Sequence, residues 1–202
     1  MVGLVKRVSG GFAMLQSVSK ISVSVYKLLP SGGATVCGDA IISPDYVLTT
    51  AACVTDSLGN PLLSMLGQFS PSSKSWPQAG GGWYGTALTT NYLRSATLMT
   101  SDLQTCGHTD ATFTDQSGSQ ICTLYDLTPG NGICWEDYGA PLFINYSNQN
   151  TIAGIASWVD VPGDSSCLSS GVADHFTNAY YHLDFIIKVT GLIKPYLTAG
   201  GK

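Results

Sequence analysis

Six cysteines are the residues of this 202-residue chain that could most readily do chemistry. Cysteine thiolates bind zinc when they stand close together, often as Cys-x-x-Cys pairs, and no such pair occurs here. Cysteines without that spacing are typical of disulfide bonds formed in an oxidising compartment. We therefore expect a secreted or extracellular protein that has disulfides and no metal or other cofactor. The six are Cys37, Cys53, Cys106, Cys122, Cys134 and Cys167.

The segment from Cys134 to Leu142 has the pattern of a catalytic loop. It reads Cys-Trp-Glu-Asp-Tyr-Gly-Ala-Pro-Leu and resembles the nucleophile loop of trypsin-like serine proteases, Cys-x-Gly-Asp-Ser-Gly-Gly-Pro-Leu. Tyr138 stands where that family has its catalytic serine. A phenol has neither the reach nor the geometry of the serine hydroxyl that attacks a scissile carbonyl. The resemblance therefore implies a protease fold that has lost its nucleophile.

A second segment, from Cys37 to Cys53, agrees with the first. It reads Cys-Gly-Asp-Ala-Ile-Ile-Ser-Pro-Asp-Tyr-Val-Leu-Thr-Thr-Ala-Ala-Cys and resembles the histidine motif of the same family, Cys-Gly-Gly-Ser-Leu-Ile-Ser-x-x-Trp-Val-Leu-Thr-Ala-Ala-His-Cys. Ala52 replaces the general-base histidine and cannot accept a proton. Between Cys53 and Trp83 the only carboxylate is Asp56, which lies too close to Ala52 to be the aspartate of the triad. This stretch is also shorter than in the family, so we expect the aspartate's strand to be missing.

Other acidic and histidine side chains do not replace the missing groups. His108, His175 and His182 lie outside the motifs that match the family. Single histidines of this kind are usually surface residues or locally hydrogen-bonded ones. Asp102 precedes Cys106, and we assign it no catalytic role. We therefore predict that the chain is not an enzyme and has no catalytic residue.

The oxyanion hole and the substrate pocket also depart from the family pattern. Glu136 occupies the position of the glycine whose backbone N–H stabilises the developing oxyanion, and it brings a negative charge there. Ser157, Trp158 and Val159 match the Ser-Trp-Gly strand beside bound peptide, with Val159 in place of the glycine. Gly132 stands where a trypsin carries the aspartate that selects basic side chains. These degenerate positions predict a cleft that no longer serves peptides.

The sequence Lys-Arg-Val-Ser-Gly-Gly, which starts at Lys6, resembles the activation site of the family. In active members the N-terminus freed by cleavage pairs with the aspartate before the serine, and Asp137 matches that aspartate. Arg7 and Val8 are therefore a candidate activation site. An equally weighted alternative is a basic residue that simply precedes a turn.

The resemblance also selects a disulfide pairing, namely Cys37–Cys53, Cys106–Cys122 and Cys134–Cys167. Separately, Asn145 begins the sequon Asn-Tyr-Ser and is a candidate glycosylation site.

The fold implied by the resemblance is all-β, a two-barrel trypsin-like fold with a shortened N-terminal barrel and a C-terminal helix. We expect the N-terminal barrel over residues 8–80 and the C-terminal barrel with its closing helix over residues 81–202. A first barrel that lacks strands must be rebuilt, closed by another route or left with open edges that need cover. A protein partner could provide that cover.

Local patterns favour the same organisation. Residues 21–26 alternate apolar and polar side chains, as a half-buried strand does. Residues 40–42 and 46–48 flank the turn signal Ser-Pro-Asp, and residues 151–158 are expected to form a central strand. A helix that packs in the core is predicted by apolar residues at helical spacing, namely Leu183, Ile186, Ile187 and Ile193.

Composition excludes two classes of partner. Only 11% of the residues are charged and the net charge is −4, so the chain has no basic footprint for nucleic acid. No apolar run approaches the roughly 20 residues of a membrane-spanning helix.

We therefore expect a secreted, non-catalytic binding or regulatory protein with a protein partner. The stretch from Leu48 to Cys53 looks similar to that of oomycete glucanase inhibitor proteins, which makes inhibition of a secreted enzyme such as a glucanase one option. A structural subunit of an extracellular assembly is the competing hypothesis, and an oligomer is compatible with both. The remaining alternative is residual hydrolysis through a rearranged site.

Overall fold

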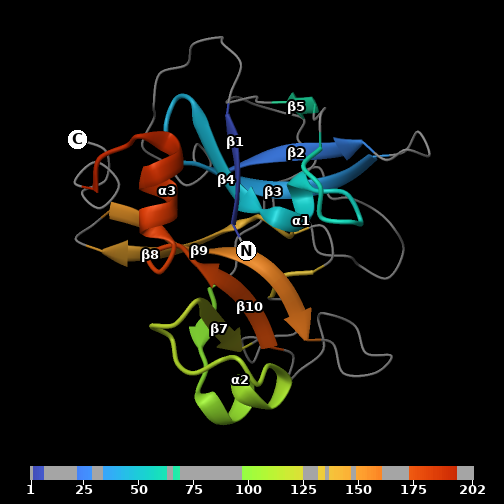
Figure 1. Cartoon of the computed structure of the whole chain (residues 1–202). Helices are drawn as coiled ribbons and strands as arrows, with labels where there is room; N and C mark the ends of the chain where they lie inside the picture. Colours follow the sequence, from blue (N-terminus) through green and yellow to red (C-terminus); the bar gives the residue numbers. More distant parts are fainter. Residues whose placement is uncertain are drawn as a thin grey trace.

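The computed structural model of the chain has two five-stranded antiparallel sheets and three short helices in its described part. That part comprises residues 2–6, 22–28, 34–62, 66–68, 97–124, 132–134, 137–146, 149–160 and 173–194. The two sheets lie one above the other, with α3 beside their junction and α2 at the far end of the second sheet (Figure 1). The predicted all-β class is confirmed at this level.

The strands pair in an order that keeps each half of the chain in its own sheet. The first sheet has the order β1 (Val2–Lys6), β4 (Tyr46–Thr50), β3 (Ala34–Ile41), β2 (Ser22–Leu28) and β5 (Leu66–Gln68). The second has the order β6 (Met99–Thr100), β7 (Gln120–Leu124), β10 (Ala173–Asn178), β9 (Gln149–Asp160) and β8 (Pro141–Tyr146). The helices are α1 (Ala51–Val54), α2 (Leu103–Thr109) and α3 (Leu183–Thr190).

The β3–β4 hairpin forms where the turn signal predicts it. The Ser43 hydroxyl accepts hydrogen bonds from the backbone N–H groups of Asp45 at 3.2 Å and of Tyr46 at 3.1 Å. Serine and aspartate favour turns because their short side chains bond to nearby backbone in this way. The strands predicted over residues 21–26 and 151–158 are also present, as β2 and as the middle of β9.

β1 is a strand that the sequence patterns do not predict. It pairs with β4 along five residues, from Val2 opposite Thr50 to Lys6 opposite Tyr46. On its other side β4 pairs with β3 at only two positions, Ala40 with Leu48 and Ile41 with Val47. The segment before Arg7 therefore supplies most of the backbone pairing of β4.

α3 matches the predicted closing helix, with one correction. Leu183 and Ile186 are buried, as expected for the core side of the helix. Gly191 ends the helix in the left-handed conformation, at φ 71°, and its N–H bonds to the carbonyl of Ile187. Ile193 therefore lies beyond the helix and is 66% exposed, so its assignment to the core was wrong.

The two sheets meet through a shared core and a close backbone contact. Ala40, Leu48, Ile155 and Ile186 form one buried cluster that joins β3, β4, β9 and α3. Beside it the N–H of Gly38 donates to the carbonyl of Tyr138 at 2.8 Å, and the N–H of Gly139 donates to the carbonyl of Ala156 at 2.8 Å. The loop of residues 137–140 is thus bonded to the first sheet on one side and to β9 on the other.

The contact between the loop and the first sheet requires a glycine at position 139. Its φ is 93°, in the left-handed region, and a Cβ there would collide with the carbonyl oxygen of Gly38 and lie 2.5 Å from the Thr49 hydroxyl. Only glycine satisfies both the backbone conformation and the lack of space.

We expect Gly139→Ala to lower the free energy of unfolding by about 3 kcal/mol or more, because strain and steric overlap add. Gly59→Ala is the matched control, since Gly59 also has a positive φ, of 83°, but no atom within 4 Å of the added Cβ. That variant should cost only about 1–2 kcal/mol, the cost of the left-handed backbone. Urea unfolding of both variants measures the difference, and equal costs would contradict the crowding argument.

Candidate functional site at the junction of the two sheets

The structure brings together the two positions that sequence analysis assigns to the lost base and nucleophile. Ala52 lies on α1, directly before Cys53, and Tyr138 lies on the loop that reaches the first sheet. The Cys53 Sγ atom is 3.6 Å from the carbonyl oxygen of Tyr138. The Cys37–Cys53 disulfide, with its Cα atoms 6.1 Å apart, holds α1 against β3 at this point. Residues 85 positions apart in the sequence are therefore neighbours at the junction.

The described side chains at these two positions are not those of a general base and an activated nucleophile. Ala52 has no group that accepts a proton. The pKa of Tyr138 is raised, chiefly by burial and also by the negative charge of Asp137, so its phenol stays protonated at neutral pH. A neutral phenol is a poor nucleophile.

Asp137 organises the loop that carries Tyr138. Its carboxylate accepts a hydrogen bond from the N–H of Cys134 at 2.8 Å, and its own N–H donates to the carbonyl of Cys134 at 3.0 Å. The N–H of Ala140 donates to its carbonyl at 2.9 Å. Asp137 is buried and belongs to the frame of the loop.

A second buried carboxyl, Asp174, lies next to this loop. It sits on β10, opposite Thr123 on β7 and Val159 on β9, and accepts a hydrogen bond from the N–H of Ile133 at 3.2 Å. This bond brings the 132–134 segment, which includes the predicted pocket position Gly132, beside β10. The Oδ1 atom of Asp174 has no hydrogen-bond partner in the described part of the chain.

Burial controls the protonation of Asp174. Loss of water raises its pKa from 3.8 to about 7; the bond from Ile133 opposes this rise and the charge of Asp137 adds to it. Near neutral pH a large share of the molecules therefore carry a neutral carboxylic acid here. Sequence analysis did not single out Asp174, which lies inside β10 (Ala173–Asn178) two residues before the buried Phe176.

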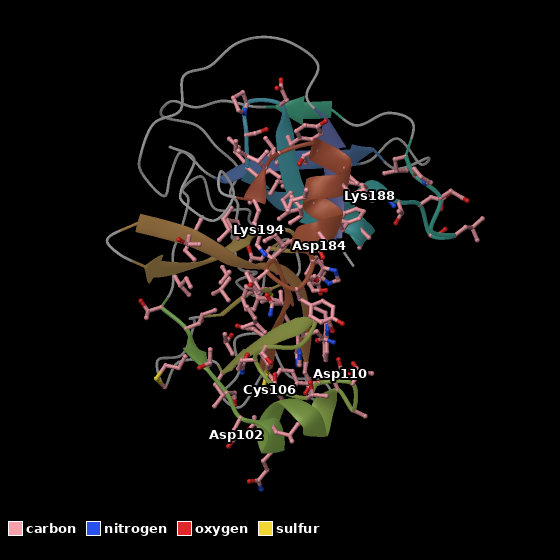
Figure 2. The ribbon with its side chains drawn as sticks, turned by 60° about the vertical axis from the view of Figure 1, so that its left-hand side comes forward. Asp102, Cys106, Asp110, Asp184, Lys188 and Lys194 are labelled. Carbon is pink, nitrogen blue, oxygen red and sulfur yellow. A yellow bond between two sulfur atoms is a disulfide. The ribbon has the colours of Figure 1, made fainter. Side chains whose placement is uncertain are left out.

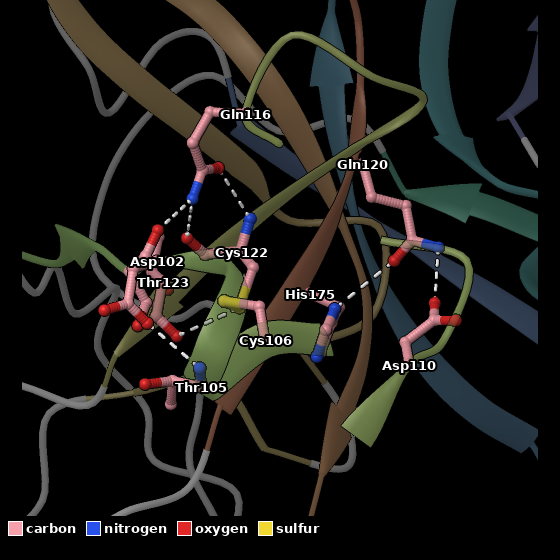
Figure 3. The surroundings of a disulfide bond; sticks show 10 residues. Asp102, Thr105, Cys106, Asp110, Gln116, Gln120, Cys122, Thr123 and His175 are labelled. Atoms are coloured by element: carbon pink, nitrogen blue, oxygen red, sulfur yellow. Dashed lines mark hydrogen bonds between the residues drawn. A yellow bond between two sulfur atoms is a disulfide. The ribbon is translucent and has the colours of Figure 1, made fainter. Parts of the chain in front are cut away.

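His175 lies next in β10 and faces the other side of the sheet. Its ring stacks on Trp158, with the centroids 3.8 Å apart and the planes 5° from parallel. Figure 3 shows how His175 connects through Gln120 to Asp110. The Gln120 amide nitrogen donates to Asp110 at 2.6 Å, so its oxygen is left to accept from His175 Nδ1, at 3.3 Å.

This network keeps His175 neutral and structural. Burial lowers the pKa of His175, and the nearby charges of Asp110 and Asp160 offset part of that effect. The pKa of Asp110 is lowered in turn, first by the hydroxyl of Thr112. The prediction that His175 is a locally satisfied histidine holds, and Trp158 serves as its stacking partner.

The remaining titratable residues named by sequence analysis have structural places. Asp56 closes an exposed turn by accepting from the N–H groups of Leu58 and Asn60, at 2.9 and 2.8 Å. Asp102 caps α2 by accepting from the N–H of Thr105 at 2.9 Å. His182 is the N-cap residue of α3, and its pKa is lowered chiefly by burial. His108 lies within α2.

Two of the three predicted disulfides are present, Cys37–Cys53 and Cys106–Cys122. Figure 2 shows Cys106 on α2 at the end of the second sheet. Cys134 is disulfide-bonded, and its predicted partner Cys167 lies outside the described residues. Glu136, Arg7 and Val8 also lie outside them. Asn145 is on β8, an edge strand of the second sheet, one residue before the strand ends at Tyr146.

Metal ligands and membrane helices are not found where the structure can be described. Over those residues no group of three or more histidine, cysteine, aspartate or glutamate side chains is placed to hold a metal ion. No helix among them is both long enough and apolar enough to span a bilayer.

Comparison with known proteins does not assign the chain to a family. A scan against protein-family models finds no match, and a search of curated proteins finds no similar sequence.

We expect Asp174→Asn to stabilise the protein at alkaline pH and to change little at acid pH. The folded-state pKa of Asp174 lies above its unfolded value. Below about pH 4 the carboxyl is protonated in both states and its contribution to the free energy of unfolding is fully present. That contribution is lost as pH rises through about 7. The neutral amide avoids this loss, which is on the order of 4 kcal/mol above pH 7. Urea unfolding at several pH values between 4 and 8 measures the difference.

Asp102→Asn is the control of opposite sign. Its hydrogen bonds lower the pKa of Asp102, so the charged form adds stability above the unfolded pKa and loses it as pH falls. That variant should therefore be slightly less stable than the parent at neutral pH. If the gain in unfolding free energy of Asp174→Asn over the parent did not grow with pH, burial of the carboxyl would be contradicted as the cause of its raised pKa.

Proposed function

We propose that the chain is a catalytically inactive homologue of trypsin-like serine proteases and acts as a secreted binding or regulatory protein. In this proposal its two sheets correspond to the two barrels of that fold, with the first one shortened. Inhibition of a secreted enzyme such as a glucanase is one concrete form of the binding role.

The observation that carries the proposal is the contact of Cys53, which directly follows Ala52, with the backbone of Tyr138. The sequence motifs that match the family lie far apart in the chain, yet the Cys53 sulfur and the Tyr138 carbonyl are 3.6 Å apart. The disulfides Cys37–Cys53 and Cys106–Cys122, which the resemblance selects, support the same assignment. An alanine and a protonated tyrosine in these two places favour a binding role over catalysis.

Retention of the frame also supports a binding role. Asp137, Gly139 and the disulfide-bonded Cys134 keep the loop in position although its reactive groups are gone. A surface that binds a partner needs a rigid frame as much as an active site does. A rigid loop would therefore serve a binding role even without catalytic side chains.

The protein should not react with an active-site-directed serine probe such as a fluorophosphonate, and should not hydrolyse peptide or ester substrates. Restoring histidine and serine with Ala52→His and Tyr138→Ser should not recover turnover, because no aspartate partner or oxyanion glycine is available. Mass spectrometry detects the labelling, and an active trypsin serves as the positive control. Labelling at Tyr138, with turnover lost in Tyr138→Phe, would overturn the proposal in favour of residual hydrolysis.

A structural subunit of an extracellular assembly is the second candidate, favoured by the surface around α3. Five of the exposed large hydrophobic residues gather there, namely Tyr180, Tyr181, Phe185, Val189 and Ile193. Asp184, Lys188 and Lys194 surround the same helix (Figure 2). Apolar surface concentrated on one helix is typical of a contact between protein chains.

Size-exclusion chromatography with light scattering separates the two candidates. A soluble inhibitor should elute as a monomer across a wide concentration range, whereas an assembly subunit should form oligomers or filaments as concentration rises. Phe185→Glu tests the surface, because a charge there should dissociate the oligomers, while Leu58→Glu, at an 85% exposed apolar position on a separate turn, should not. Oligomers that Phe185→Glu leaves intact would exclude the α3 surface as the contact.

A further inference from the structure

β1 is held in the first sheet by β4 alone. Among the described strands it is an edge, and its five residues pair with Tyr46 to Thr50 of β4. It also lies against α1. Because β1 is an edge strand, its loss would leave the order of the other four strands unchanged.

β4 needs the strand that β1 provides. Val47, Leu48, Thr49 and Thr50 are all at least 97% buried, so both faces of β4 are covered. Because β3 pairs with β4 at two positions only, removal of β1 would leave most of the β4 backbone without a sheet partner. Unpaired N–H and C=O groups beside a buried apolar strand strongly favour a replacement strand.

β4 is anchored independently of β1. The Thr49 hydroxyl donates to the carbonyl of Gly38 at 3.2 Å, and Leu48 belongs to the core cluster with Ile155 and Ile186. Directly after β4, Cys53 is joined to Cys37 of β3 by a disulfide. The edge of β4 should therefore persist when β1 is gone.

The sequence places a point of cleavage directly after β1. The strand ends at Lys6, and Arg7 follows, which makes a dibasic pair of the kind that secreted proteases cut. Cleavage after Arg7 would break the covalent link between β1 and the rest of the sheet. A peptide with about five paired residues binds weakly, because its ordering entropy opposes the few backbone bonds that it makes.

We propose that the edge of β4 is a strand-docking site, which β1 closes in the intact chain and which cleavage after Arg7 opens to an extended segment of a partner protein. The inference deepens the proposed binding function and rests on it for the existence of a partner. The partner segment takes the place of β1 as the fifth strand and runs antiparallel to β4, with backbone hydrogen bonds for affinity and side-chain contacts for selection.

The chemistry of β1 specifies the partner segment. β1 reads Val-Gly-Leu-Val-Lys, so it is aliphatic and uncharged over the four positions that oppose Val47 to Thr50, and it has a basic residue only at the Tyr46 end. A partner should therefore present four uncharged residues rich in valine, leucine or isoleucine, with glycine or another small residue opposite Thr49. Such a segment has the β propensity that the site requires.

The test uses the full chain with a specific protease site inserted after Arg7, folded with its disulfides intact and cut afterwards. The probe is a fluorophore-labelled peptide with the sequence of Val2–Lys6, and fluorescence anisotropy measures its binding. The cut protein should bind this peptide about ten-fold or more tightly than the uncut protein. The same peptide with proline in place of Leu4 should not bind, because proline cannot pair in a sheet ladder.

Two further variants test whether β1 itself blocks the edge of β4. Leu4→Pro with Val5→Pro should detach β1 in the uncut chain and so increase peptide binding. Lys6→Cys with Tyr46→Cys, which are opposite each other in the register, should cross-link β1 to β4 and prevent binding after the cut. Near-UV circular dichroism reports whether the fold survives in each case.

Equal peptide binding before and after the cut would overturn the inference, as would a cut protein that retains β1 against excess labelled peptide. Unfolding of the cut protein would also overturn it, since the β4 edge would then not persist. None of these outcomes bears on the absence of catalysis, which the serine probe tests separately.

Discussion

The contact of Gly139 with the backbone of β3 is the constraint on which the rest of the structure depends. A residue with a side chain would push the 137–140 loop away from Gly38, and the hydrogen bonds from Gly38 to Tyr138 and from Gly139 to Ala156 could not form together. These bonds set the distance between the two sheets. The core cluster of Ala40, Leu48, Ile155 and Ile186 can close only at that distance.

Two buried carboxyls, Asp137 and Asp174, lie near each other and differ in their hydrogen-bond partners. Asp137 accepts from the N–H of Cys134 and stays part of the loop, whereas burial raises the pKa of Asp174 to about 7. A buried group that is half satisfied makes stability depend on pH. Asp174 therefore makes the folded protein more stable at mildly acidic than at alkaline pH. His175 has the opposite effect, because burial lowers its pKa and its protonation at acid pH destabilises the fold.

The segment before Arg7 forms β1, which is one edge of the first sheet. β1 pairs with five residues of β4, and β3 pairs with two, so the edge that the sequence leaves open is closed by the start of the described chain. This solution is local and reversible, since β1 has no other strand neighbour among the described elements. The Cys37–Cys53 disulfide, which restricts the unfolded chain by about 3 kcal/mol, keeps β4 and α1 in place whatever happens to β1.

The sequence by itself determined the β-rich class, the β3–β4 hairpin and the closing helix, because each depends on local pattern. The pairing of Cys37 with Cys53 and of Cys106 with Cys122 was implied by the family resemblance and is present in the structure. The resemblance also placed Ala52 and Tyr138 in corresponding motifs. Only the tertiary structure decided that these two lie at one junction, that Asp174 is buried beside Asp137, and that Ile193 is exposed beyond Gly191. It alone showed β1, because strand pairing at an edge depends on which backbone groups are left unpaired elsewhere, and no short stretch of sequence records that.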